Sequence, residues 1–167
     1  MVIWIVEDDD DDAGKAYDVV TQVAGEKTGK SPSHSVKIYR VKLIEWPPEL
    51  RVLGESENRI ETDIQKARPS IVILDIFDRG SFRAPEFLRG LREWEHNLAE
   101  SKSTGVKRFR SFVILWTIWT NEDEVLSFLQ QQSQRDRRIS YTQTKNLVLL
   151  GDHLEGFWRQ CDEERNP

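Results

Sequence analysis

The stretch VIWIVEDDDDD, residues 2–12, joins a short apolar run directly to six consecutive acidic residues. Its first five residues, Val2 to Val6, are all β-branched or aromatic, a composition that predicts a buried β-strand. The acidic run from Glu7 to Asp12 places like charges side by side, where they repel one another unless solvent or a cation screens them. Two interpretations follow: the acids form a solvated turn, or some of them gather at the end of the strand to bind a cation.

Four later segments also have the composition of strands. SIVILDIF (70–77) and FVILWTIW (112–119) are nearly continuous apolar runs, as expected for strands that are buried on both faces of a sheet. SVKIYRVKLI (35–44) alternates apolar and polar residues, which indicates a half-exposed strand, and ISYTQT (139–144) gives a weaker strand signal.

Between these strands, apolar residues recur at the spacing of amphipathic helices. The helical series fall within residues 13–23, 60–67, 87–98, 125–129 and 154–161. Asp152 and Glu155 have the spacing of a capping box, which predicts that the last helix begins near residue 152. Strand and helix thus alternate five times, and this alternation predicts an α/β fold with a parallel sheet covered by helices on both faces. We expect one domain over residues 1–167, with surface insertions near 25–35 and 101–111 and no output domain.

Composition excludes several classes of protein. The net charge of −5 argues against a general nucleic-acid binder, because such proteins usually carry a basic stripe. The short basic clusters at 107–110 and 135–138 are interpreted as solvated surface. The single cysteine, Cys161, excludes an internal disulfide and a multi-cysteine metal site. No apolar run is long enough to cross a bilayer and no signal-peptide pattern opens the chain, so we expect a cytoplasmic protein that binds neither nucleic acid nor membrane.

The expected strands deliver polar residues to one edge of the sheet. In open α/β sheets, ligand sites form outside the carboxyl ends of the strands, and here these ends carry Glu7, Asp8, Asp75, Thr117 and Lys145. A few carboxylates at such a position suit Mg²⁺. A carboxylate beside the cation can be a nucleophile toward a phosphoryl group, while a lysine and a hydroxyl bind the phosphoryl oxygens. The set therefore predicts a site for phosphoryl capture.

Each of these residues also has a purely structural interpretation. Glu7 and Asp8 could lie in a solvated turn, Asp75 could cap a turn, and Lys145 could be a surface lysine. Residues 9–12 are expected to form the exposed start of the first helix, where carboxylates interact favourably with the helix dipole.

Four sequence motifs resemble the receiver domain of response regulators in two-component signalling. IVEDD is similar to the acidic motif after the family's first strand, ARPSIVILDIFDRG to its third strand and following turn, FVILWT to its fourth strand, and YTQTK to the end of its fifth strand. The resemblance implies a phosphoacceptor at Asp75, a switch hydroxyl at Thr117 and the family lysine at Lys145. It implies metal contacts from Glu7, Asp8, Asp75 and the backbone carbonyl of Phe77.

The resemblance also implies a fold and a reaction. The family fold is flavodoxin-like, with five parallel strands in the order 2-1-3-4-5 and five flanking helices. Its members form a Mg²⁺-dependent aspartyl phosphate, received from a sensor histidine kinase or a histidine phosphotransfer protein. They are not enzymes beyond their own phosphorylation and dephosphorylation. A stand-alone receiver would signal through contact with a downstream protein, and receivers often pair as homodimers.

Two alternatives remain open at this point. A pseudo-receiver would keep the fold and act as a phosphorylation-independent interaction module; Asn146, Ile118 and Thr142, which differ from the family pattern, favour it. A Mg²⁺-dependent Toprim-like hydrolase also places acids after its strands, but DIFD separates Asp75 and Asp78 by one residue more than a DxD motif requires.

Overall fold

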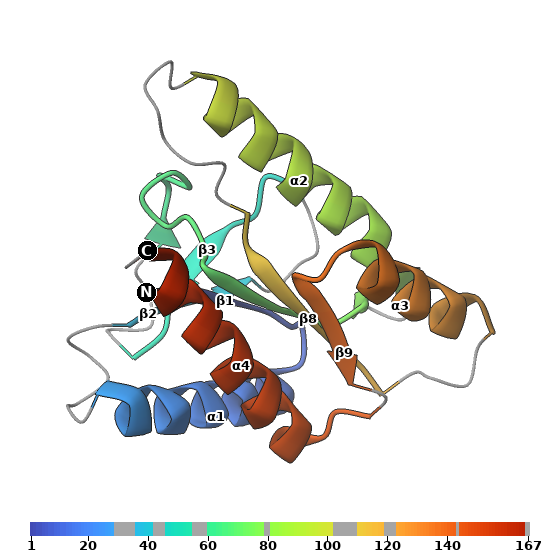
Figure 1. The fold of residues 1–167 in the computed structure, drawn as a ribbon, viewed down its shortest axis with the longest axis horizontal. Helices are drawn as coiled ribbons and strands as arrows, with labels where there is room; N and C mark the ends of the chain where they lie inside the picture. The colour runs from blue at the N-terminus through green and yellow to red at the C-terminus, as the bar shows by residue number, and fades with distance from the viewer. Residues whose placement is uncertain are drawn as a thin grey trace.

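A seven-stranded sheet with helices on both faces forms the body of the protein, as the computed structural model shows (Figure 1). The structure describes residues 1–28, 36–41, 46–54, 60–78, 81–101, 110–118, 123–142 and 144–165. The seven-stranded, largely parallel sheet confirms the expected α/β class.

Five of the strands are parallel and form most of the sheet. They are β1 (Val2–Val6), β2 (Lys37–Val41), β5 (Ile71–Leu74), β8 (Phe112–Trp116) and β9 (Ile139–Thr142). Two short antiparallel strands, β3 (Leu50–Val52) and β4 (Ile60–Glu61), extend the sheet beyond β2, so that the order is β4-β3-β2-β1-β5-β8-β9. A separate hairpin pairs β6 (Phe77–Asp78) with β7 (Ser81–Phe82).

The four helices of the described residues cover the sheet in pairs (Figure 1). Helices α1 (Asp10–Thr28) and α4 (Leu147–Arg165) pack on one face, and α2 (Ala84–Ser101) and α3 (Asp123–Arg135) pack on the other. None of these helices is both long and apolar enough to cross a membrane.

The central strands are apolar throughout because they are buried on both faces. In β1, Trp4 and Val6 belong to the core under α2 and α3, whereas Ile3 and Ile5 belong to the core under α1 and α4. Side chains of a strand alternate between the two faces, so a strand with a helical layer on each side needs apolar residues at every position. Each buried Ile or Val contributes about 1.5–3 kcal/mol by leaving water.

Within the described residues the main sheet has seven strands and there are four helices, whereas five of each were expected. The chain as a whole does not form a five-stranded 2-1-3-4-5 sheet, because β3 and β4 are added at its β2 edge. The helix expected over 60–67 is absent from the described structure: Ile60 lies in β4, and residues 64–67 form a single turn. The Asp63 carboxylate accepts hydrogen bonds from the N–H groups of Gln65 and Lys66. These local bonds satisfy the backbone donors of the turn, so that no helix is needed to pair them.

The last helix begins five residues earlier than the capping-box pattern at Asp152 predicts. Its first residue is Leu147, and the side-chain oxygen of Asn146 accepts from the N–H groups of Val148 and Leu149 at 2.9 and 3.1 Å. Asn146 is therefore the N-cap of α4. Cys161 is a free cysteine that is buried in α4. Of the expected insertions, residues 25–28 belong to α1, while 29–35 and 102–109 lie outside the described residues.

Candidate functional site

The acidic run after β1 divides into residues that cap a helix and residues that face inward. Asp9 caps α1: its Oδ1 accepts from the N–H groups of Asp11 and Asp12 at 2.9 and 3.0 Å. Glu7 is only 2% exposed, and its Oε1 accepts from the N–H of Asp9 at 3.1 Å. Glu7 therefore points into the molecule at the carboxyl end of β1, as the sequence predicts for a site residue.

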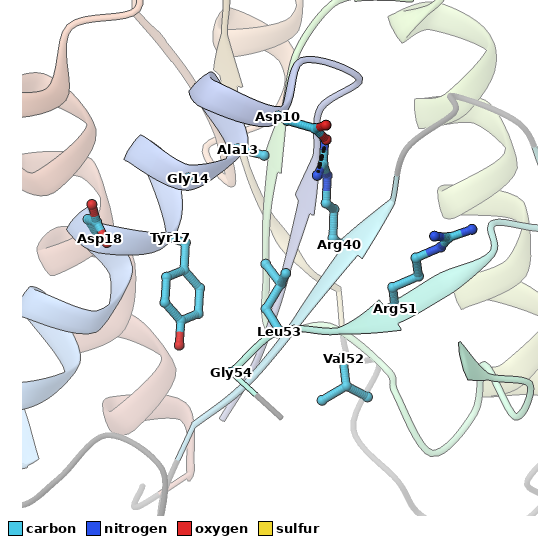
Figure 2. A pocket seen from close by; sticks show the side chains of 10 residues that line it. All are labelled: Asp10, Ala13, Gly14, Tyr17, Asp18, Arg40, Arg51, Val52, Leu53 and Gly54. Carbon is cyan, nitrogen blue, oxygen red and sulfur yellow. Dashed lines mark ion pairs between the residues drawn. The ribbon is translucent and has the colours of Figure 1, made fainter. Parts of the chain in front are cut away.

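Arg40, in β2, binds the acidic segment at residues 7–10. Its Nη1 forms an ion pair with Asp10 Oδ1 at 2.5 Å, which Figure 2 marks with a dashed line. Its Nε and Nη2 donate to the carbonyl oxygen of Glu7, and Nη2 also donates to that of Asp8, all at 3.4 Å. Arg40 could not be predicted as a site residue from the sequence, because its role depends on the pairing of β1 with β2.

Asp75 lies beside Glu7 because β1 and β5 are neighbours in the sheet. Its N–H donates to the carbonyl of Val6 at 2.9 Å, which continues the pairing of the two strands, and its side chain is buried. Glu7, Asp8 and Asp75 each offer a carboxylate oxygen within 4.8 Å of the others. The structure thus brings together the three carboxylates that the sequence analysis predicts.

Lys145 reaches the same point from the segment after β9. Its ammonium lies 2.6 Å from Glu7 Oε2, 2.7 Å from Asp12 Oδ2 and 3.1 Å from Asp75 Oδ2, and the side chain is only 9% exposed. The same ammonium stands 5.1 Å from the centroid of the Trp116 ring, where a cation–π contact adds to its binding. Lys145 is therefore part of the cluster rather than a surface lysine.

Asp12 lies in the first turn of α1, as predicted from the sequence, but its side chain is only 21% exposed and belongs to the cluster. Its two carboxylate oxygens bind different cations, Lys15 at 2.7 Å and Lys145 at 2.7 Å. The signal that could have identified it is its position: Asp12 directly precedes Ala13, the first core residue of α1, so it lies at the border of the buried face.

The pKa values of these groups show how burial and charge act on the cluster. Burial, together with the charge of Asp75, raises the pKa of Glu7 from 4.5 to about 7, although Lys145 opposes the shift. Burial also raises the pKa of Asp75. Burial would lower the pKa of Lys145, but its hydrogen bonds to Asp12 and Glu7 hold that pKa above the ordinary value. Asp12 is less buried, and hydrogen bonds from Lys145 and Lys15 keep its pKa low.

The other expected site residues lie at the same edge of the sheet. Thr117 directly follows β8 and is fully buried. Leu74 of β5 pairs with Leu115 of β8, so Asp75 and Thr117 come one and two residues after paired positions at the same edge of the sheet. Phe77 opens β6, and its N–H donates to Asp75 Oδ1 at 3.4 Å. Ile118, one residue after Thr117, is 56% exposed and extends toward solvent.

The residues present fit a divalent cation. The donors of Glu7, Asp8 and Asp75 are all carboxylate oxygens, the ligand type that Mg²⁺ prefers. One ammonium, that of Lys145, faces three carboxylates. Burial raises the pKa values of Glu7 and Asp75 in spite of this ammonium, and the charge of Asp75 raises that of Glu7 further. A bound cation would add positive charge that stabilises the ionised carboxylates.

A pocket lies next to the acidic cluster rather than on it. A pocket of about 600 Å³ separates α1 from the segment that follows β3, with the Arg40–Asp10 pair at one end and the Tyr17 side chain at the other (Figure 2). Gly54 lines the pocket beside Tyr17. A glycine is favoured at this position because its φ of 81° is unfavourable for other residues and a Cβ would stand 2.6 Å from Tyr17 Oη.

Comparisons with protein-family models, with curated proteins and with solved structures find no match to this chain.

Proposed function

We propose that the chain is a cytoplasmic receiver that accepts a phosphoryl group on Asp75 from a phosphohistidine and signals by protein contact. The observation that carries the proposal is the position of Lys145. Its ammonium comes from the segment after the last strand to stand 3.1 Å from Asp75, beside a group of carboxylates suited to Mg²⁺. Nucleophile, cation ligands and a fixed positive charge are thus gathered at one point.

The sheet supports the same proposal. Counted in chain order, the five parallel strands lie in the order 2-1-3-4-5, which is the flavodoxin-like arrangement expected of a receiver. In chain order, the antiparallel strands β3 and β4 and the turn at 64–67 come between the second and third parallel strands, where a receiver has its second helix. This difference lies at the β2 edge of the sheet, away from Asp75 and Lys145.

In the proposed reaction, a carboxylate oxygen of Asp75 attacks the phosphorus of a phosphohistidine. A P–O bond forms, the P–N bond breaks, and the departing imidazole nitrogen takes the bonding pair and a proton from solvent. Glu7, Asp8 and Asp75, with the Phe77 carbonyl, would hold Mg²⁺, which when bound supplies neutralising charge for the phosphoryl oxygens. Lys145 provides a point charge for one phosphoryl oxygen, and the Thr117 hydroxyl donates to another.

Intact mass after incubation with acetyl phosphate and Mg²⁺ tests the proposal. We expect the native protein to gain one phosphoryl group, and Asp75→Asn to gain none. Asp18→Asn, which alters an exposed aspartate of α1, is the matched control and should gain the group as the native protein does. A gain that survives in Asp75→Asn would show that a different residue is the acceptor.

One observation favours a second function, that of a phosphorylation-independent interaction module. Lys145 already binds Glu7, Asp12 and Asp75, so the cluster is held together by the protein's own charge. Absence of a mass gain in folded protein that binds Mg²⁺ would favour this pseudo-receiver, and its partners would then recognise the unmodified surface.

A further inference from the structure

We propose that the pocket between α2 and α3 binds a small phosphate monoester with an apolar body. The pocket has a volume of about 360 Å³, within the range of small-molecule sites. Four arginines line it: Arg89 and Arg92 from α2, Arg135 from the last turn of α3, and Arg110 from the segment before β8. Such a concentration of positive charge is notable in a chain whose net charge is −5.

Part of this charge is already neutralised. Asp136 Oδ2 pairs with Arg92 Nη2 at 3.3 Å and with Arg110 Nη2 at 3.2 Å. Arg92 Nη1 also pairs with Glu95 Oε2 at 2.8 Å, and Glu95 in turn accepts from the backbone and hydroxyl of Ser111. Two carboxylates thus face four guanidinium groups, which leaves two positive charges.

The remaining donors face no acceptor within the described part of the chain. The side chains of Arg89 and Arg135 are exposed and form no ion pair or hydrogen bond with described residues, and the buried Nε of Arg92 has no hydrogen-bond partner among them. A buried N–H without a partner is costly, and a ligand oxygen would satisfy it.

The rest of the lining is apolar and indicates what the anion is attached to. Leu88 of α2, Phe128 of α3 and Ile139 of β9 supply apolar side chains between the arginines. A phosphate monoester carries a charge of roughly −1.5 to −2 at neutral pH, which matches the two unpaired positive charges, and arginine binds phosphate through paired hydrogen bonds. The apolar side chains would then contact the body of the ester.

The pocket is separate from the Asp75 site. Arg110 and Asp136 precede β8 and β9, at the amino ends of these parallel strands, whereas the acidic cluster lies at the carboxyl ends. Binding in this pocket does not depend on the proposed phosphorylation of Asp75. Arg135 belongs to the basic cluster that was interpreted from the sequence as solvated surface, and in this proposal it binds the ligand.

Titration with phenyl phosphate in EDTA, followed by calorimetry and by amide chemical shifts, tests the proposal. EDTA removes divalent cations, so that phosphoryl transfer to Asp75 does not contribute. We expect saturable binding, with shifts centred on residues 88–92 and 132–139. The double variant Arg89→Ala/Arg135→Ala should weaken binding about tenfold or more, because the loss of a single charged hydrogen bond already costs roughly a factor of ten. Arg159→Ala, an exposed arginine of α4, should leave it within about twofold.

Inorganic phosphate and benzoate distinguish the two parts of the ligand. Both should bind more weakly than phenyl phosphate, since the first lacks the apolar body and the second carries a single charge. Absence of saturable binding, or equal weakening by the double variant and by Arg159→Ala, would overturn the proposal. Shifts confined to residues 7–12 and 75 would overturn it as well.

Discussion

Replacement of Lys145 by methionine tests whether one buried ammonium holds the acidic cluster together. Methionine keeps a long, flexible side chain but removes the charge. The ammonium contacts three carboxylates at 2.6–3.1 Å. At an effective dielectric constant of about 20, two unit charges 4 Å apart attract each other by about 4 kcal/mol. Part of this attraction offsets the desolvation of Lys145, and removal of one partner from a buried ion pair typically costs about 3–5 kcal/mol.

We expect Lys145→Met to lower the free energy of unfolding by about 3–5 kcal/mol at pH 8 without Mg²⁺. The loss should be smaller at pH 5. The pKa of Glu7 is about 7 in the native protein, so at pH 5 its carboxyl group is protonated and no longer repels the other carboxylates. Urea denaturation at the two pH values measures both numbers.

Lys15→Met is the matched control. Lys15 also pairs with Asp12 at 2.7 Å, but its side chain is 54% exposed, so its removal should change stability little. Equal stability of the two variants at pH 8, or an equal loss in Lys145→Met at pH 5 and at pH 8, would contradict a central role of this ammonium.

Three further predictions concern other parts of the structure. The folded-state pKa of Glu7 is raised from 4.5 to about 7, so its stabilising effect is complete below pH 4.5 and is lost as pH rises through 7; the loss is on the order of 3 kcal/mol without Mg²⁺. A urea series should show this loss in the native protein and not in Glu7→Gln. Asn146→Ala removes the cap of α4 and should cost about 1 kcal/mol in the same assay, while Asn97→Ala, within α2, should not. A Cβ at Gly90 would stand 2.8 Å from Trp46 Cγ, so Gly90→Ala should destabilise the protein by about 1–3 kcal/mol. Gly25 has open space around it, so Gly25→Ala should stabilise the protein by about 0.5–1 kcal/mol. Thermal unfolding measures both changes, and equal shifts of Tm in the two variants would contradict this contrast.

The elements that could be predicted from the sequence are those whose burial is uniform. Residues 2–6, 71–74 and 112–116 are apolar at every position because a helical layer covers each face of the sheet there. The region 60–67 was mispredicted because three apolar residues at helical spacing, Ile60, Ile64 and Ala67, are too few to stabilise a helix, and Ile60 is 46% exposed at the sheet edge. The early start of α4 was missed because Leu147, Val148 and Leu149 are exposed and obscure the helical period.

The α/β alternation and the meeting of Glu7, Asp8 and Asp75 can be predicted from the amino-acid sequence, because neighbouring parallel strands bring their carboxyl ends to one edge. Which charges pair depends on the packing of the helices and cannot be predicted from the sequence. Asp12 binds Lys145 across 133 positions of the chain because α1 and α4 pack together, and Arg89 and Arg135 line one pocket because α2 and α3 share a face. Strand and helix formation depend on local periodicity, whereas the partner of a charge depends on which faces the folded chain brings together.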